Sequence, residues 1–228
     1  MILSQTELIS SYQEILKLFR QYLEKRLKIK PESSHLTLTQ DKAALLKQLA
    51  TRALECQKCL LYRTRTNLVF GGENSNAQLM LVGEAPGREE DLRGVPFVGA
   101  AGKLLEESFK INNLSRTEVY IANILKCRPP NNRNPQPEEI SACLPYLKKQ
   151  IEIIHPRIIC TLGKFATQIL LNRWEKIADL RGKVYLYEKD VYLIPTFHPA
   201  ACIYRPGWKN TFINDLKLVR EKLKGVKE

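Results

Sequence analysis

Four short, almost wholly apolar runs alternate with amphipathic segments between residues 79 and 195. Apolar runs of five or six residues are typical of strands buried on both faces, and helical spacing between them indicates crossover helices. We therefore predict an α/β fold with three layers, in which a four-stranded parallel sheet is flanked by helices. The predicted strands are 79–83, 119–123, 157–162 and 191–195, and the predicted helices between them are about 101–110, 137–153 and 164–172.

The first 40 residues follow a different pattern. Apolar residues from Leu8 to Leu27 recur at helical spacing, and Ser4 with Glu7 forms a capping-box pattern in front of them. The Lys-Pro-Glu-Ser-Ser stretch at 30–34 then indicates a linker. We predict an N-terminal helical extension with its linker over residues 1–40, which either packs on the body or binds a protein partner. A second helix is expected over about 41–55, at the start of a main domain spanning 41–228.

The composition favours some partners and compartments over others. Thirty-six Lys and Arg residues against 24 Asp and Glu residues give a net charge of +12, which suits a polyanionic partner such as nucleic acid and equally an ordinary basic surface. No run of about 18 uncharged apolar residues is present, so no membrane-spanning helix is expected. The N-terminus lacks the pattern of a signal peptide. We therefore expect a cytoplasmic protein with no membrane partner, whose cysteines do not form disulfides.

Four of the six cysteines form two spaced pairs. Cys56 and Cys59 make a C-x2-C pair, and Cys127 and Cys143 make a C-x15-C pair across a proline-rich loop. Four thiolates can bind a tetrahedral zinc ion or an iron–sulfur cluster, and spacing alone does not decide between these or four unligated cysteines. Cys160 lies in the middle of a predicted strand, where we expect a small buried side chain.

Unusual residues follow the predicted strands at their carboxyl ends. In parallel α/β sheets the functional site forms where loops leave these ends. Here the positions are the Gly-Glu-Ala-Pro-Gly turn at 83–87, Asn123, Gly163 and the His198-Pro199 pair.

Four motifs in this order carry a family resemblance: GEAPGREED at 83–91, PFVGAAGKLL at 96–105, NILKCRPPNNRNPQPEEISACLPYL at 123–147 and PTFHPA at 195–200. Together with the cysteine pairs, they resemble the type 4 uracil-DNA glycosylases, the iron–sulfur members of the uracil-DNA glycosylase superfamily. The resemblance implies a four-stranded parallel sheet and one [4Fe-4S] cluster on Cys56, Cys59, Cys127 and Cys143. It also implies hydrolysis of the bond between uracil and deoxyribose. No lysine of these motifs is placed to form a Schiff base, so we expect a monofunctional enzyme that leaves an abasic site.

The resemblance also implies roles for single residues. Phe97 would lie against the uracil ring, although an ordinary core phenylalanine is the simpler interpretation. Asn123 offers a donor and an acceptor for the O4 and N3–H edge of uracil, although asparagine is also a common turn residue. His198 would donate to uracil O2 and stabilise the charge that develops on the departing base.

The first motif departs from the classical members of the superfamily. Ala85 stands where they carry an aspartate that orients water, which leaves Glu84 as the nearest carboxylate and our candidate for that task. Its alternative role is a structural carboxylate that accepts from loop amides. Gly87 stands where they carry a tyrosine that excludes thymine, and by resemblance Glu90 fills this space near uracil C5. The predicted substrate-binding residues are Gly83, Ala85, Gly87, Glu90, Phe97, Asn123 and His198, with Glu84 and His198 as catalytic residues.

A last group of residues is expected to contact the DNA duplex. Lys164 opens a helix whose N-terminus suits a phosphate. In the family an apolar wedge follows the histidine motif, and here the wedge is either Cys202 or Ile203. The predicted DNA-binding residues are Arg128, Arg133, Lys164, Ile203 and Arg205.

The leading hypothesis is therefore a monomeric repair enzyme that acts on uracil-containing DNA. A catalytically silent, cluster-containing accessory protein that binds nucleic acid is the main alternative. A zinc-bound α/β scaffold is the third.

Overall fold

The computed structural model describes residues 41–72, 74–188 and 190–225. The helix predicted between Ser4 and Leu27, and the division at residue 40, depend on residues outside these ranges and stay predictions. Among the described helices, none combines the length and the apolar character that a membrane span needs.

The centre of the described protein is a five-stranded sheet in the order β2-β1-β3-β5-β4. The first four strands of this order run parallel, and β4 pairs antiparallel with β5. The strands are β1 (Leu79–Gly83), β2 (Val119–Asn123), β3 (Ile158–Leu162), β4 (Tyr185–Glu188) and β5 (Val191–Thr196). Strands β1, β2 and β3 are buried along their whole length, as their apolar sequences predict. The α/β class and the four parallel strands are confirmed.

The fifth strand, β4, was not predicted. It lies at the edge of the sheet and pairs only with β5, and its four residues alternate between half-buried and exposed. The sequence does contain a short apolar run, Val-Tyr-Leu-Tyr at 184–187, but no strand was assigned to it in the sequence analysis. The antiparallel edge strand is therefore an addition to the predicted four-stranded sheet.

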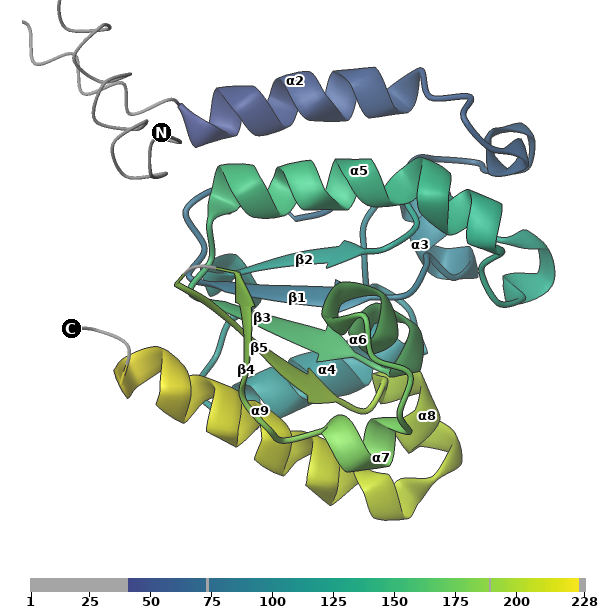
Figure 1. Cartoon of the computed structure of the whole chain (residues 1–228). Helices are drawn as coiled ribbons and strands as arrows, with labels where there is room; N and C mark the ends of the chain where they lie inside the picture. The colour runs from purple at the N-terminus through teal and green to yellow at the C-terminus, as the bar shows by residue number, and fades with distance from the viewer. Residues whose placement is uncertain (1–40, 73, 189, 226–228) are drawn as a thin grey trace, which may run out of the picture. The chain divides into compact units, whose positions relative to one another are not determined.

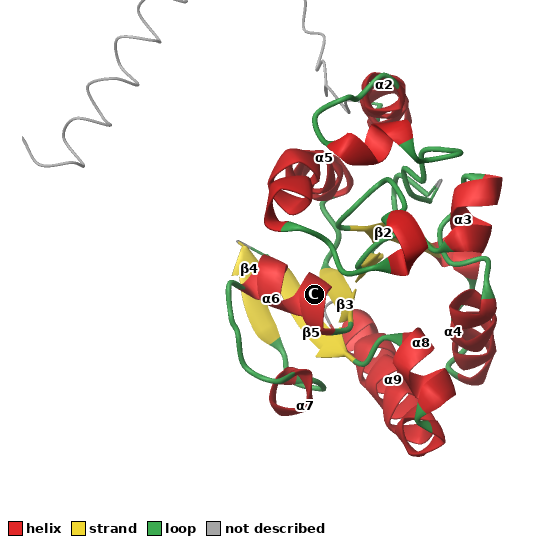
Figure 2. Ribbon diagram, turned by 90° about the vertical axis from the view of Figure 1, so that its right-hand side faces the viewer, coloured by secondary structure: helices red, strands yellow, loops and turns green. Residues whose placement is uncertain are grey.

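Helices cover both faces of the sheet, as Figures 1 and 2 show. On one face α5 (Pro137–Ile154) and α6 (Lys164–Leu171) pack on the strands, and α2 (Lys42–Leu54) lies against α5. On the other face the core is closed by α4 (Ala100–Ile111) and α9 (Lys209–Gly225). The predicted helices are present, with ends shifted by one or two residues. The shorter helices are α3 (Arg88–Arg93), α7 (Ile177–Leu180) and α8 (Pro199–Tyr204), with 3-10 turns at Leu60–Arg63, Arg116–Glu118, Pro130–Asn132 and Pro206–Trp208.

A close backbone contact fixes the loop before α4. Gly102, in the first turns of α4, lies directly against the carbonyl group of Phe97, and a methyl group at this position would overlap that carbonyl. Phe97 itself has a positive φ of 52°, a conformation that a bulky residue adopts only when its surroundings impose it. The guanidinium of Arg116 donates to the carbonyls of Pro96 and Phe97 and holds the loop from the other side.

We expect Gly102→Ala to lower the free energy of unfolding by about 1–3 kcal/mol, because the added methyl group must displace a backbone carbonyl. Gly225→Ala is the matched control, since this helical glycine has no neighbouring atom within 4 Å of an added Cβ. The control should be neutral or slightly stabilising, because alanine favours helix over glycine. Chemical denaturation of both variants measures the difference, and equal midpoints would contradict the packing argument.

Candidate active site and thiol site

The loops at the carboxyl ends of the parallel strands surround a pocket of about 370 Å³. It brings together residues of four separate motifs, which span more than 100 positions of the sequence. Its walls are formed by Glu84, Ala85, Pro86, Gly87, Glu90, Phe97, Ala101, Asn123, Pro129, Asn132, Arg133, Asn134, His198 and Ala200.

Asn123 lies at the base of this pocket with its amide unpaired. It is the last residue of β2, it pairs in register with Gly83 of β1, and it is 1% exposed. Neither Oδ1 nor Nδ2 has a hydrogen-bond partner among the described residues. A buried amide without partners costs free energy, so this arrangement indicates a ligand that offers both an acceptor and a donor.

Phe97 and Asn123 both pack on the backbone of Gly83. A Cβ on Gly83 would lie 2.7 Å from Cζ of Phe97 and would overlap Oδ1 of Asn123. Only glycine therefore lets the ring and the amide meet over the end of β1. The Phe97 ring also lies near that of His198, with centroids 5.7 Å apart. These three side chains can stack on a flat polar ring and contact its edge.

His198 is held as a neutral donor. It caps α8, where the N–H of Ala200 donates to Nδ1 at 3.2 Å. Since Nδ1 is an acceptor, the neutral ring carries its proton on Nε2. Burial lowers the pKa of His198 to about 4, while the nearby carboxylate of Glu90 acts in the opposite direction. At neutral pH the ring is therefore an uncharged Nε2–H donor in the pocket wall.

Glu84 supplies the second titratable group of the pocket. It follows β1 directly, and its backbone carbonyl accepts from the N–H of Leu125 at 3.0 Å. Burial raises the pKa of its carboxyl group to about 7. A carboxyl with this pKa exchanges protons near neutral pH, which suits a group that binds water or faces a developing positive charge.

Glu90 closes the side of the pocket next to Gly87. Its Oε1 accepts from the N–H groups of Val98 and Gly99 at 2.9 and 2.8 Å. Its Oε2 lies 2.7 Å from the point where a Cβ of Gly87 would stand. Glu90 therefore fills the space that the small residue leaves, and it also holds the loop that carries Phe97. The sequence analysis predicted only the first of these roles.

The four paired cysteines line a second cavity together. Cys56, Cys59, Cys127 and Cys143 all face it, with Arg65, Lys126 and Tyr146 among its other walls. The two Cys pairs, which are distant in the sequence, thus lie at the same cavity in the structure. The described residues contain no group of three or more Cys, His, Asp or Glu side chains placed to hold a single metal ion. Four thiols around one cavity are the kind of ligand set that binds a zinc ion or an iron–sulfur cluster.

Burial and nearby hydrogen-bond donors act on these thiols in opposite directions. Burial raises the pKa of Cys143 to about 11 and also raises the pKa of Cys59 and Cys127, so bare thiols stay protonated. Donors nevertheless face the sulfurs: Arg65 donates to Cys127 Sγ at 3.3 Å, and the backbone N–H of Lys126 donates to Cys143 Sγ at 3.2 Å. Such N–H groups are suited to metal-bound thiolates, so the donor set fits a thiolate-ligated group.

Comparison with known proteins identifies the family. A family model described as the uracil DNA glycosylase superfamily matches residues 70–217. The chain is 47% identical over 183 residues to a type-4 uracil-DNA glycosylase of Archaeoglobus fulgidus, covering 77% of this chain and 92% of that protein. It is 46% identical over 184 residues to a type-4 uracil-DNA glycosylase of Sulfurisphaera tokodaii, with 77% and 84% covered. This chain belongs to the uracil-DNA glycosylase superfamily.

The resemblance to type 4 members of the superfamily is thereby confirmed. A segment of a DNA polymerase of Bacillus phage SP01 is also similar, at 31% identity over 156 residues, which covers 68% of this chain and 17% of that protein. The superfamily domain thus also has relatives within longer chains.

The arginines predicted to contact DNA have protein partners in this superfamily member. Arg133 forms a two-point ion pair with the buried Glu139, at 2.6 and 3.0 Å, and lines the pocket itself. Arg128 donates to the side chain of Asn132 at 2.7 Å, which holds the loop between Cys127 and α5 in shape. Arg205 lies over the Trp208 ring at 4.5 Å. Lys164 is exposed at the start of α6. Whether these residues contact DNA stays a prediction.

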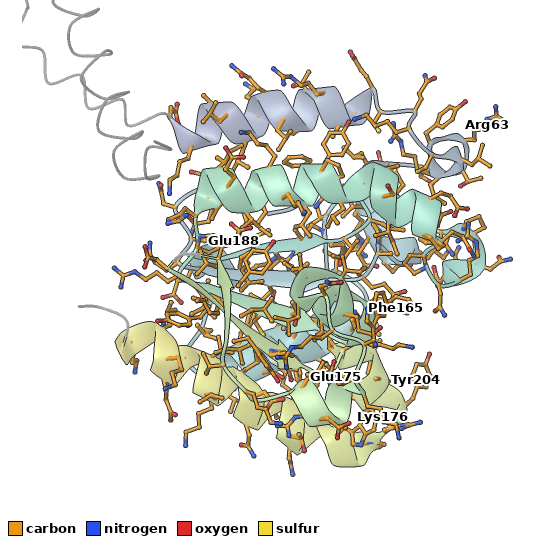
Figure 3. The ribbon with its side chains drawn as sticks, viewed as in Figure 1. Arg63, Phe165, Glu175, Lys176, Glu188 and Tyr204 are labelled. Carbon is orange, nitrogen blue, oxygen red and sulfur yellow. The ribbon has the colours of Figure 1, made fainter. Side chains whose placement is uncertain are left out.

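The two wedge candidates differ in their exposure. Cys202 is 2% exposed and its thiol lies 3.8 Å from the Trp208 carbonyl, so it belongs to the core of the uracil-DNA glycosylase domain. Ile203 is 43% exposed and the neighbouring Tyr204 is 85% exposed. Figure 3 shows Tyr204 at the side of the molecule to which the parallel strands point. Ile203 remains the predicted wedge, and Tyr204 is an exposed aromatic side chain that the sequence analysis did not single out.

We expect NMR to find His198 neutral with its proton on Nε2 throughout pH 5.5–8. Its lowered pKa predicts titration only near pH 4, and the Ala200 N–H fixes the tautomer. The ring ¹⁵N shifts, assigned with a His198→Gln variant, report both properties. A ring that titrates near pH 6.5, or that carries its proton on Nδ1, would contradict this description of the pocket.

Proposed function

We propose that this protein removes uracil from DNA by hydrolysing the N-glycosidic bond and leaves an abasic site. The observation that carries this proposal is the buried, unpartnered amide of Asn123 in a pocket that Phe97 and His198 also line. Uracil O4 can accept from Nδ2 of Asn123, and uracil N3–H can donate to Oδ1. The relatives named as type-4 uracil-DNA glycosylases support activity over the catalytically silent alternative.

A base inside duplex DNA cannot reach such a pocket, so the nucleotide must first be turned out of the stack. Phe97 then covers one face of the base, and Glu90 with Gly87 limits the space at the position where thymine carries a methyl group. Breaking the bond leaves negative charge on the base and positive charge on the sugar. The Nε2–H of His198 stabilises the first of these charges, as an oxyanion-hole donor does.

Glu84 is proposed to act on the sugar side of the bond. Its carboxylate can bind the attacking water or stabilise the positive charge of the sugar. The Ala85 side chain beside it has no polar group for this task.

We further propose that Cys56, Cys59, Cys127 and Cys143 bind a [4Fe-4S] cluster. The shared cavity, the N–H groups facing the sulfurs and the type-4 relatives support this assignment. Such a cluster, when bound, supplies strong thiolate bonds that fix the chain around it. The residues between Cys127 and Cys143 form part of the pocket wall, so the thiol site helps to hold that wall in place.

The DNA partner is proposed to carry uracil in at least one strand. The monomeric state, the cytoplasmic location and a protein partner for residues 1–40 stay predictions from the sequence.

Excision of uracil should depend on the side chains of Asn123 and His198. We expect Asn123→Ala to raise the barrier by about 1–3 kcal/mol, because the uracil edge is left unpaired in a buried site. His198→Ala should raise it by about 2.7–4 kcal/mol, because the donor to the departing base is lost. The assay is single-turnover cleavage of a uracil-containing oligonucleotide, read as strand scission after alkali.

DNA affinity should change little in both variants, since phosphate contacts dominate binding. The same oligonucleotide with thymine in place of uracil is the control for the assay. Wild-type rates in both variants would show that the pocket is wrongly assigned. Absence of scission by the wild-type protein would refute the proposed function.

The pH dependence of excision should follow Glu84. Because its pKa is raised to about 7, its carboxylate form gains population as pH rises through neutrality. We expect the wild-type rate to increase between about pH 6 and 8, and Glu84→Gln to be slow and nearly independent of pH. Glu152→Gln, an exposed residue on α5 that pairs with Lys149, is the control. A Glu84→Gln variant that keeps the rising profile would assign that titration to another group.

The purified protein should be brown, with broad absorbance near about 400 nm from a thiolate-ligated iron–sulfur cluster. Replacing any of Cys56, Cys59, Cys127 or Cys143 by alanine should remove this absorbance. Cys160→Ala and Cys202→Ala are matched controls, because both thiols are buried elsewhere in the core, and they should keep it. A colourless protein with stoichiometric zinc would rule out the cluster.

A further inference from the structure

A buried lysine lies between the pocket and the thiol site. Lys126 is 1% exposed, and its ammonium group donates to the backbone carbonyl of Asn123 at 2.9 Å and to Oε1 of Gln150 at 2.6 Å. Neither the sequence motifs nor the function proposed above gives this side chain a role.

The partner amide of Gln150 is itself fixed in one orientation. Its Nε2 donates to the carbonyl of Phe70 at 3.0 Å and to the hydroxyl of Tyr120 at 2.8 Å. A carbonyl can only accept and an ammonium can only donate, so Oε1 must face Lys126. Gln150 and Tyr120 are both fully buried. Lys126, Gln150 and Tyr120 therefore form a continuous hydrogen-bonded series of buried side chains, which reaches the Asn123 carbonyl at the pocket.

The backbone of Lys126 belongs to the thiol site. Its N–H donates to Cys143 Sγ, and the next residue is Cys127. Among the described residues, no ion pair joins Lys126 to a carboxylate. Burying an ammonium group is costly unless it is hydrogen-bonded, and here the Asn123 carbonyl and Oε1 of Gln150 supply the acceptors.

The Asn123 amide depends on its backbone for its position. Because Oδ1 and Nδ2 have no partner among the described residues, no side-chain hydrogen bond there orients the group. What fixes it is packing against Gly83 and the placement of its own main chain. The main chain of Asn123 is held by its pairing with Gly83 of β1, and its carbonyl oxygen accepts a hydrogen bond from the Lys126 ammonium.

We propose that Lys126 is a positioning residue that sets the direction of the Asn123 amide and joins it mechanically to the thiol site. Its side chain holds Asn123, and its main chain holds Cys143. This inference rests on the proposed function, because it names a residue that acts through the base-reading amide.

The test is a double-mutant cycle between Lys126 and Asn123. Lys126→Met keeps the length of the side chain and removes the ammonium, and Lys126→Gln keeps a polar donor. In the wild-type background we expect Lys126→Met to slow single-turnover excision about 10- to 100-fold, as small misplacements of a positioned group do. In the Asn123→Ala background the same change should slow excision less than about 3-fold, because the group it positions is gone.

Lys42→Met is the matched control. The Lys42 ammonium donates to the carbonyl of Ile154 at 2.7 Å, so this variant also removes a lysine–carbonyl bond, away from the pocket. It should leave the excision rate unchanged in both backgrounds. Both Lys126 variants should retain absorbance near about 400 nm, because the contact with Cys143 is made by the main chain, and Lys126→Gln should be slowed less than Lys126→Met.

Three results would overturn the proposal. Equal slowing by Lys126→Met with and without Asn123 would show a general structural role. Loss of the 400 nm absorbance or of the folded circular dichroism spectrum in both Lys126 variants would show that the ammonium serves the thiol site or the core. A wild-type rate in Lys126→Met would show that Asn123 needs no such support. An inactive wild-type protein would instead refute the proposed function.

Discussion

The pocket depends on the parallel pairing of β1 with β2. In that register Gly83 lies opposite Asn123, and two further backbone bonds, from Ile124 to Gly83 and from Leu125 to Glu84, extend the pairing into the loops. The last residues of two strands are thus locked together where the loops begin. The amide of Asn123 and the carboxyl of Glu84 are placed by main-chain hydrogen bonds of the sheet, which are far stiffer than contacts between loops. Phe97 and His198 are then brought to this fixed edge from other elements.

One loop serves both sites. The chain leaves β2 at Asn123, reaches the thiol site at Cys127 and returns along the pocket wall through Arg133 before α5 carries Cys143 back to the same cavity. The pocket and the thiol site therefore share one short stretch of chain, from Asn123 to Cys143. A change in the geometry of the thiols would therefore reach the pocket wall, so the proposed cluster would influence a reaction in which it takes no part.

Much of this arrangement could be predicted from the sequence, for physical reasons. The strands β1, β2, β3 and β5 are apolar because they are covered by helices or strands, and burial on both faces leaves a clear pattern. The edge strand β4 is half solvated and only four residues long, and its short apolar run, Val-Tyr-Leu-Tyr at 184–187, was not interpreted as a strand. Asn123 and His198 could be found because Asn123 ends β2, His198 closely follows β5, and both lie within recognisable motifs. The second role of Glu90 could not be predicted, because only the tertiary structure shows its hydrogen bonds to the loop amides of Val98 and Gly99. The position of Lys126 could not be predicted either, because it depends on a hydrogen bond to the distant Gln150. The wedge position was undecided for the same reason, since burial of Cys202 depends on Trp208.

The unpaired amide of Asn123 sets stability against activity. A folded chain gains nothing from an amide that stays buried without partners, and an apolar side chain of similar size would fill the same space at lower cost. Random substitution screened for thermal resistance alone would therefore tend to replace this residue, and the products would be robust proteins with an intact sheet but without the amide proposed to recognise the base. Such variants would be hard to distinguish by fold from their active parent. At this position, selection must act on the reaction itself to keep the asparagine.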